Sequence, residues 1–374
     1  MRIKRITLAA VATTAGAVLT AGLAIAPAVA NTPGSFIGRF HSNSTIGSTV
    51  PANGDVNPYG VAVVSHSQGK LQSGDVLVSN FNSVKNVQGT GTTIVEVAPN
   101  GAVTQFARIT ASHLPGACPG GIGLTTALNV LSGGWVIVGS LPTSHNGTVF
   151  TGSGCLLVLN SEGTVVETFS GHGINGPWDM AAVQFGPFDE LFVTNVLNGT
   201  AAAAGKVVHR GTVLRLVLAN FGDGPPRLIN VTKIGSGFPQ RTDPAALVLG
   251  PTGLGLGEDG TLYVADTLAN RIAAIPDAVL RPDSAGRGLT LTSGGALNAP
   301  LGLFIAPGGD VLTVNGDNGK IVETAPSGGQ VATRQLDSSG SPPGSGALFG
   351  LAVAPNAAGV YYVDDATNTL NLLH

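Results

Sequence analysis

The sequence predicts an all-β protein, a six-bladed β-propeller whose last blade is closed by an N-terminal strand. Three observations predict this fold: a Gly-rich composition with few charges, a unit that recurs six times, and two chain ends that complement each other. Of 374 residues 55 are Gly, 43% are apolar and 10% are charged. The apolar content is too high for a disordered chain, and the Gly residues follow no collagen-like period. Lys and Arg total 18 against 21 Asp and Glu, so the chain offers no basic field for a nucleic-acid partner.

The first 30 residues have the features of an export signal. Three basic residues among the first five precede an apolar run over 6–26, and an A-x-A cleavage site ends at Ala30. The run is rich in small residues rather than in Leu, which favours cleavage over an uncleaved membrane anchor. We therefore expect 1–30 to be a cleaved signal peptide and 31–374 to be a single propeller domain. The protein is expected to be secreted or periplasmic, with no stable membrane insertion after cleavage.

The repeated unit is clearest over 250–275, which reads GPTGLGLGEDGTLYVADTLANRIAAI. A Pro-x-Gly opener leads into a short apolar run, a Gly/Asp turn, a second strand and a third strand. Five related units occur, and the residues that open the six inner strands are Gly60, Gly123, Asp179, Gly253, Gly302 and Gly350. Each unit alternates short β-prone runs with turn residues and lacks a helical period. Small sheets repeated around an axis form a propeller, so six units predict six blades.

The two ends of the chain predict how the ring closes. The last unit stops at His374 after its third strand, whereas the segment 35–41 reads as a strand that belongs to no unit. Pairing the N-terminal strand with the last unit would complete the sixth blade.

The fourth unit, with LYVADTLANRI behind its Pro-x-Gly opener, resembles the NHL repeat of six-bladed β-propellers, and the fifth and sixth units show the same pattern. The resemblance covers most of 57–374 as architecture and about half of it at the level of motifs. It implies the propeller fold, with a role as a scaffold, a ligand-binding domain or an enzyme. Lactonases of the gluconolactonase type are related propellers that hold a divalent metal through an acidic residue of an early inner strand. This chain departs from that pattern, because its Glu residues fall in outer strands or lower turns: Glu96, Glu162, Glu167, Glu190, Glu258 and Glu323.

Propeller topology assigns the loops to faces. Each inner strand begins at one face, here called the upper face, which also carries the loop between the second and third strands; the lower face carries the other two turns. The second-to-third-strand loops are long in the first three units (80–91, 140–154, 195–211) and short in the last three (266–270, 315–318, 364–368). Long loops in a compact domain usually serve a purpose. They predict a cleft over one half of the upper face, with flexible decoration as the alternative.

Asp179, with Trp178 beside it, is the candidate functional centre. Gly is favoured where inner strands crowd a narrow channel, so a carboxylate at this position needs a partner, a water or a metal. Residues at the ends of second strands could join it in a ring of oxygens suited to a divalent cation or to sugar hydroxyls: Asn80, Asn195, Asp266 and Asn315. The alternative is that Asp179 binds backbone N–H groups and Trp178 packs between blades.

Four histidines map to upper-face loops and are candidate metal ligands: His113, His145, His172 and His209. They could form a zinc site or an acid–base pair. No H-x-H or H-E-x-x-H spacing supports this, which favours solvated loop histidines. Cys118 and Cys155 are the only cysteines, and an exported chain with two cysteines is expected to pair them. Two free thiols are the alternative.

The sequence therefore predicts an exported binding module that recognises a small molecule, a glycan or a protein at its upper face. The alternative is a metal-assisted hydrolase or lyase that acts in the same central cleft. The candidate cofactor is a divalent cation in the central channel.

Overall fold

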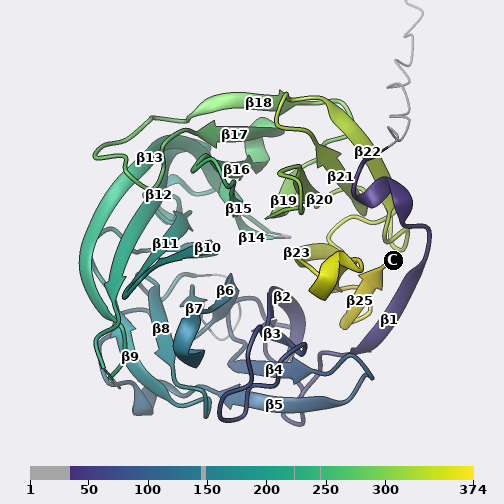
Figure 1. Ribbon diagram of the computed structural model, residues 1–374. Helices are drawn as coiled ribbons and strands as arrows, with labels where there is room; N and C mark the ends of the chain where they lie inside the picture. The colour runs from purple at the N-terminus through teal and green to yellow at the C-terminus, as the bar shows by residue number, and fades with distance from the viewer. Residues whose placement is uncertain (1–33, 145–148, 223, 245) are drawn as a thin grey trace, which may run out of the picture.

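The computed structural model describes residues 34–144, 149–222, 224–244 and 246–374. The predicted signal peptide 1–30 and His145 lie outside the described residues. The described chain forms six antiparallel sheets that stand around a central axis (Figure 1). This arrangement confirms the predicted six-bladed β-propeller. In the described part of the chain no helix has the length and apolar character needed to cross a membrane.

The blades follow one another along the chain, and each begins with its innermost strand. Blade 1 contains β2 (Val56–Val63), β3 (Val76–Asn82), β4 (Thr93–Val97) and β5 (Val103–Arg108), and blade 2 contains β6 (Leu124–Val130), β7 (Val136–Ser140), β8 (Cys155–Leu159) and β9 (Val165–Phe169). Blade 3 contains β10 (Pro177–Phe185), β11 (Phe188–Asn195), β12 (Val208–Ala219), β13 (Arg227–Asp243) and the short β14 (Leu247–Leu249). Blade 4 contains β15 (Pro251–Leu256), β16 (Leu262–Asp266), β17 (Arg271–Ile275) and β18 (Leu289–Ser293), and blade 5 contains β19 (Pro300–Ile305), β20 (Val311–Asn315), β21 (Lys320–Thr324) and β22 (Gln330–Gln335). Blade 6 contains β23 (Leu348–Val353), β24 (Val360–Asp364), β25 (Thr369–Leu373) and β1 (Asn43–Ser48).

Short 3₁₀ helices occupy some of the connections. They are η1 (Ile37–Arg39), η2 (Ala111–His113), η3 (Ser132–Gly134), η4 (Ala201–Ala203), η5 (Thr267–Ala269) and η6 (Pro355–Ala357).

The middle strands are buried on both faces because each blade lies between two others. Every residue of β8, CLLVL, is buried, and so is every residue of β17, RIAAI. Strands covered on both faces are expected to be almost continuously apolar. The core is therefore a set of apolar layers between adjacent blades rather than one central cluster.

Glycine at the inner strands permits their close approach. A Cβ atom built on Gly302 would lie 1.9 Å from the Phe349 carbonyl oxygen, and one on Gly350 would lie 2.2 Å from the Tyr59 carbonyl oxygen. These contacts explain the Gly that opens the inner strand in most units. In blade 2, Gly123 lies just before β6 instead of within it, which corrects the predicted position. The register of β6 shifts between Leu124 and Leu128, so Thr and Ala residues occupy the crowded stretch.

The N-terminal segment closes the ring, as the sequence predicts. Strand β1 pairs antiparallel with β25, from Asn43 opposite Leu373 to Ser48 opposite Thr369. It becomes the outermost strand of blade 6 (Figure 1).

The closing strand is not the predicted segment 35–41, which instead contains η1. The two carboxylate oxygens of Glu323 accept hydrogen bonds from the backbone N–H groups of Phe36 and Ile37, at 2.6 and 2.8 Å. These bonds stabilise a helical turn. The rings of Phe36 and Phe40 pack edge to face with their centroids 5.2 Å apart. The apolar residues of this segment thus pack onto the core between blades 5 and 6 and take no part in strand pairing.

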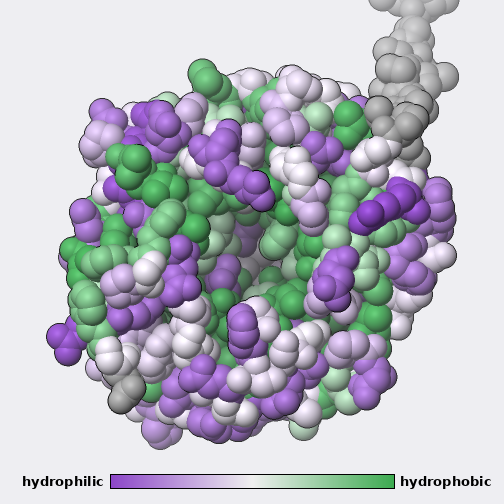
Figure 2. Space-filling view, in the orientation of Figure 1, coloured by the Kyte–Doolittle hydropathy of each residue, from purple (hydrophilic) through white to green (hydrophobic). Residues whose placement is uncertain are grey.

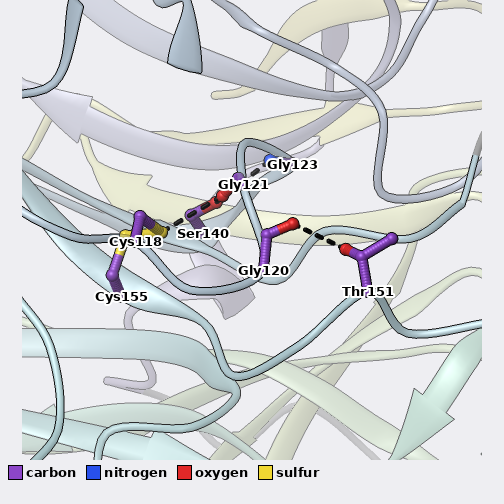
Figure 3. Close-up of a disulfide and its surroundings, with 7 residues drawn as sticks. All are labelled: Cys118, Gly120, Gly121, Gly123, Ser140, Thr151 and Cys155. Carbon is purple, nitrogen blue, oxygen red and sulfur yellow. Dashed lines mark hydrogen bonds between the residues drawn. A yellow bond between two sulfur atoms is a disulfide. The ribbon is translucent and has the colours of Figure 1, made fainter. Parts of the chain in front are cut away.

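Cys118 and Cys155 form a disulfide, as predicted, with their Cα atoms 5.3 Å apart. It joins the loop before β6 to the first residue of β8 (Figure 3). Beside it, the Ser140 hydroxyl donates to the Gly121 carbonyl at 2.9 Å and accepts from the Gly123 N–H at 3.0 Å. The bridge and these bonds fasten the entry loop of blade 2 to its own sheet.

Titration of the unfolded, unreduced protein with a thiol reagent is expected to find no free thiol, because both cysteines are bridged. After reduction the same titration should find two thiols per chain. A Cys155→Ser variant serves as the control and should show one thiol without reductant. Two thiols in the unreduced wild-type chain would contradict the bridge.

Candidate active site in the central channel

An aromatic plug divides the central channel. The Tyr59 ring stacks on the rings of Phe349 and Phe81, with ring centroids 4.0 and 4.4 Å apart. The centroid of the Trp178 ring lies 6.1 Å from that of Tyr59. Together with Leu301 these side chains belong to one buried cluster. The plug separates a lower cavity from an upper cavity, and the two share no lining residue. A hollow at the centre of the disc is visible in Figure 2.

The lower cavity has a volume of about 540 Å³ and is lined by the second halves of the inner strands. Its wall is mainly aliphatic, with residues such as Val61, Leu128, Leu254 and Leu351. Asp179 and Glu258 are the ionisable residues that line it. Glu258 is exposed in the turn between β15 and β16, whereas Asp179 is buried. A buried carboxyl in a largely apolar wall is unusual, because burying it disfavours its charged form.

The Asp179 carboxyl is held by backbone N–H groups of two blades. Its Oδ2 accepts from the Leu254 N–H of β15 at 3.0 Å, and the Met180 N–H also donates to the carboxyl. The Asp179 N–H donates to the Thr194 hydroxyl at 3.1 Å, which in turn donates to the Thr252 carbonyl at 2.9 Å. Blade 3 and blade 4 are therefore joined through this carboxyl, at a position where the inner strands of blades 1, 4, 5 and 6 have Gly.

Burial raises the pKa of Asp179 to about 7, against the opposing effect of its two backbone N–H donors. Asp179 is only 8% exposed, so the desolvation of its charged form is the dominant cause. A carboxyl with a pKa near 7 exchanges a proton readily at neutral pH, which is the property that general acid–base catalysis requires.

The upper cavity has a volume of about 330 Å³ and a polar wall over an apolar floor of Tyr59, Leu301 and Phe349. Its polar lining residues are Asn57, Asn82, Asn86, Gln88, Arg241, Asp243, Ser345, Asp317 and Asp365. Burial and the nearby charge of Asp364 raise the pKa of Asp365 to about 6. Burial and the charge of Asp243 raise the pKa of Asp317.

Only the first of the three long loops lines this upper cavity. Asn82, Asn86 and Gln88 come from the β3–β4 connection, whereas the described residues of 140–154 and 195–211 contribute none. The one-sided wall of three loops is thus not formed around the cavity. Asp317 and Asp365 come from the short loops of blades 5 and 6, which loop length alone does not mark as functional.

The predicted ring of oxygens at the upper mouth is not assembled. The Asn80 amide donates to the Thr49 carbonyl at 2.9 Å, and the Asn315 amide donates to the Ala296 carbonyl at 2.8 Å. Asn195 Oδ1 accepts from the N–H groups of Asn175 and Gly176. Each of these residues lies at or near the end of a second strand, one strand away from the axis, and binds the chain that enters the blade. None of them lines either channel cavity.

Asp266 also forms contacts within its own blade and lines neither channel cavity. Its Oδ2 lies 2.9 Å from the guanidinium nitrogens of both Arg271 and Arg287. Trp178 is buried in the plug, and this corresponds to the packing alternative for that residue. Of the six ligand-binding candidates, the structure thus places Asp179 on a cavity and Trp178 behind it.

The histidine candidates do not gather. His113 lies in η2, where its Nδ1 is 2.7 Å from the Thr110 hydroxyl, while His172 and His209 are exposed in separate segments of blades 2 and 3. Among the described residues no three His, Cys, Asp or Glu side chains are grouped so that they could hold a metal ion. His145 lies outside the described residues.

The comparisons with known proteins identify the fold class. No protein-family model matches the chain, and no curated protein sequence matches it. Solved structures do match, at low sequence identity. They include a gluconolactonase from Xanthomonas campestris (14% identity, TM-score 0.54, 88% of each chain covered) and regucalcin, a calcium-binding protein from Agrobacterium tumefaciens (13% identity, TM-score 0.56, 88% of this chain and 93% of that chain). An aldose sugar dehydrogenase from Streptomyces coelicolor, solved with PQQ bound, also matches (16% identity, TM-score 0.52, 88% of this chain and 97% of that chain).

At these identities the matches show the fold alone: a six-bladed β-propeller with structural neighbours among the gluconolactonase and regucalcin proteins. The fold implied by the NHL resemblance is confirmed. The NHL family name is not supported, because no family model matches the chain.

Proposed function

We propose that this protein is a propeller enzyme, a hydrolase or a lyase, that works in the lower cavity with Asp179 as its proton-transferring group. The observation that carries the proposal is a buried carboxyl with a pKa of about 7 in the wall of the larger channel cavity. A concave apolar site with a titratable group of perturbed pKa is the arrangement expected of an active site. This favours the enzymatic alternative over the binding module first expected from the sequence.

Asp179 can act in either reaction through one proton. In a hydrolysis, its carboxylate takes a proton from the water that attacks a substrate carbonyl and then returns that proton to the leaving group. In an elimination, it takes the proton from the carbon beside an activating group, the C–H electron pair forms the double bond as the bond to the leaving group on the next carbon breaks, and the same proton then passes to that leaving group. The Leu254 and Met180 N–H groups hold the carboxyl in place in both cases.

The residues of the lower cavity do not suit a resident divalent cation. Calcium takes six or more oxygen ligands, and the carboxylates that line this cavity are those of Asp179 and Glu258. The proposed chemistry therefore rests on the Asp179 carboxyl.

Two further features support the proposal. Structural neighbours named as a gluconolactonase and an aldose sugar dehydrogenase indicate that propellers of this shape support enzymatic reactions. The Cys118–Cys155 bridge supports work outside the cytoplasm, because structural disulfides persist in oxidising compartments. Export by the N-terminal segment is part of the same proposal.

The purified protein should be assayed against a panel of sugar lactones, other lactones and esters, and activated substrates for elimination. With any substrate that is turned over, Asp179→Asn is expected to lower kcat by at least about 100-fold, because general acid–base catalysis contributes on that order. The wild-type rate should change with pH around 7, and this dependence should be absent in the variant. Asp283→Asn, which changes an exposed carboxylate far from the channel, is the matched control.

Unchanged turnover by Asp179→Asn would show that the carboxyl only joins the blades. Loss of the wild-type activity on treatment with EDTA would replace the proposed mechanism with a metal-assisted one.

A further inference from the structure

The upper cavity offers hydrogen-bond acceptors in excess of donors. Its lining includes one basic residue, Arg241, and three carboxyl groups, those of Asp243, Asp317 and Asp365. Arg241 forms an ion pair with Asp243 at 2.7 Å, so these two charges largely cancel. Asp317 and Asp365 have no ion-pair partner among the described residues. The cavity therefore carries two uncompensated carboxyl groups.

Two buried amides indicate the same excess of acceptors independently of charge. Asn57 and Asn82 line the cavity, are 4% and 3% exposed, and have Oδ1 atoms with no hydrogen-bond partner in the described structure. The Asn82 Nδ2 already donates to the Asn86 side chain at 2.6 Å, so its donor is used while its acceptor is not. Leaving a buried carbonyl oxygen without a donor costs free energy that a bound N–H group would recover.

The size and the floor of the cavity indicate an organic ligand. A volume of about 330 Å³ is much larger than a single metal ion, and the cavity has no group of three metal ligands among the described residues. The floor is apolar, formed by Leu301, Tyr59 and Phe349 of the plug. Such a site suits a molecule with an aliphatic body and N–H donors at its ends.

We propose that the upper cavity binds a small aliphatic diamine or polyamine, with its ammonium groups at Asp317 and Asp365 and its methylene chain on the floor. The proposal is independent of the enzymatic function, because the plug separates this cavity from Asp179. A failure of either proposal leaves the other standing.

Isothermal titration calorimetry with 1,4-diaminobutane and spermidine tests the proposal on the whole protein. Asp317→Asn and Asp365→Asn, which keep the side-chain shape, are each expected to weaken binding at least tenfold, and their combination more. Raising the salt concentration should also weaken binding, since the attraction is between charges. Uncharged 1,4-butanediol is the matched ligand and should bind at least 100-fold more weakly. Asp283→Asn is the matched variant and should bind as the wild type does.

Asn82→Leu separates the effect of the unpaired acceptor from the effect of charge. It removes the unpaired oxygen without changing the charge and should also weaken diamine binding, while thermal unfolding verifies that the variant is folded. Equal affinity for butanediol and diaminobutane would overturn the proposal in favour of a neutral polyol site. Diamine binding that is unaffected by both Asp variants, or no heat of binding at millimolar diamine, would also overturn it.

Discussion

Deleting residues 34–48 is expected to destabilise the propeller more than any single substitution, because the deletion opens the ring. The segment supplies the outermost strand of blade 6 and three buried side chains, Phe36, Ile37 and Phe40. Burial of an apolar side chain of this size is worth roughly 2 kcal/mol, so the three together contribute about 6 kcal/mol before the strand pairing is counted. Since single domains are stable by only about 5–15 kcal/mol, the shortened chain should unfold at much lower denaturant concentration or fail to fold cooperatively.

Denaturant unfolding followed by circular dichroism measures this effect, and two point variants resolve its cause. Ile37→Ala, at a fully buried side chain, should lower the free energy of unfolding by about 2–4 kcal/mol. Thr45→Ala, on the exposed side of β1, removes only the hydrogen bond from the Thr45 hydroxyl to Asn371 and should lower it by about 1 kcal/mol. Equal and small effects of both variants, together with a stable deletion variant, would show that the segment only decorates a ring that is already closed.

The second large effect concerns Asp179 and pH. The folded-state pKa of about 7 lies above the ordinary value of 3.8, so the protonated carboxyl favours the folded state. The contribution of this carboxyl to the free energy of unfolding is fully present below about pH 4 and is lost as the pH rises from there through 7. The difference between the folded-state pKa and the ordinary pKa of Asp179 corresponds to about 4 kcal/mol of unfolding free energy, taken as an upper figure. Asp179→Asn cannot ionise and should not show this loss.

Comparing the two proteins at several pH values isolates Asp179 from the other carboxyls with raised pKa, such as Glu323 and Asp365. The free energy of unfolding of Asp179→Asn, relative to the wild type, should increase from pH 4 to pH 8. Asp283→Asn should show no such trend. A constant difference between Asp179→Asn and the wild type across this range would mean that the carboxyl titrates normally, and it would weaken the proposed catalytic role as well.

The propeller could be predicted from sequence because its unit is local and repeated. The strand, turn and Gly pattern of residues 250–275 recurs in the other blades, and each copy forms mostly with its own neighbours in the chain. The closing strand was harder to place, because β1 has the polar sequence NSTIGS. The segment 35–41 looks more like a strand, yet Glu323, far away in the sequence, binds its N–H groups and makes it helical.

The candidate site was predicted only in part for the same reason. Asp179 stood out because it replaces a Gly in a repeated unit, which a single sequence reveals. Whether Asp179 faces the upper or the lower cavity depends on the plug. The plug combines Tyr59, Trp178, Leu301 and Phe349 from four different blades. Asp317 and Asp365 come from different blades and line the upper cavity together. No local pattern marks such residues in advance.

The pairing of β1 with β25 also constrains the order of events during biosynthesis. The first strand of the fold has its partner among the last residues of the chain, so the ring cannot close until synthesis has passed residue 373. Until then blade 6 is incomplete, and the apolar residues between blades 5 and 6 are only partly covered. Domains tend to fold as units during synthesis. In this domain the ring closes only when the last strand, β25, is available to pair with β1.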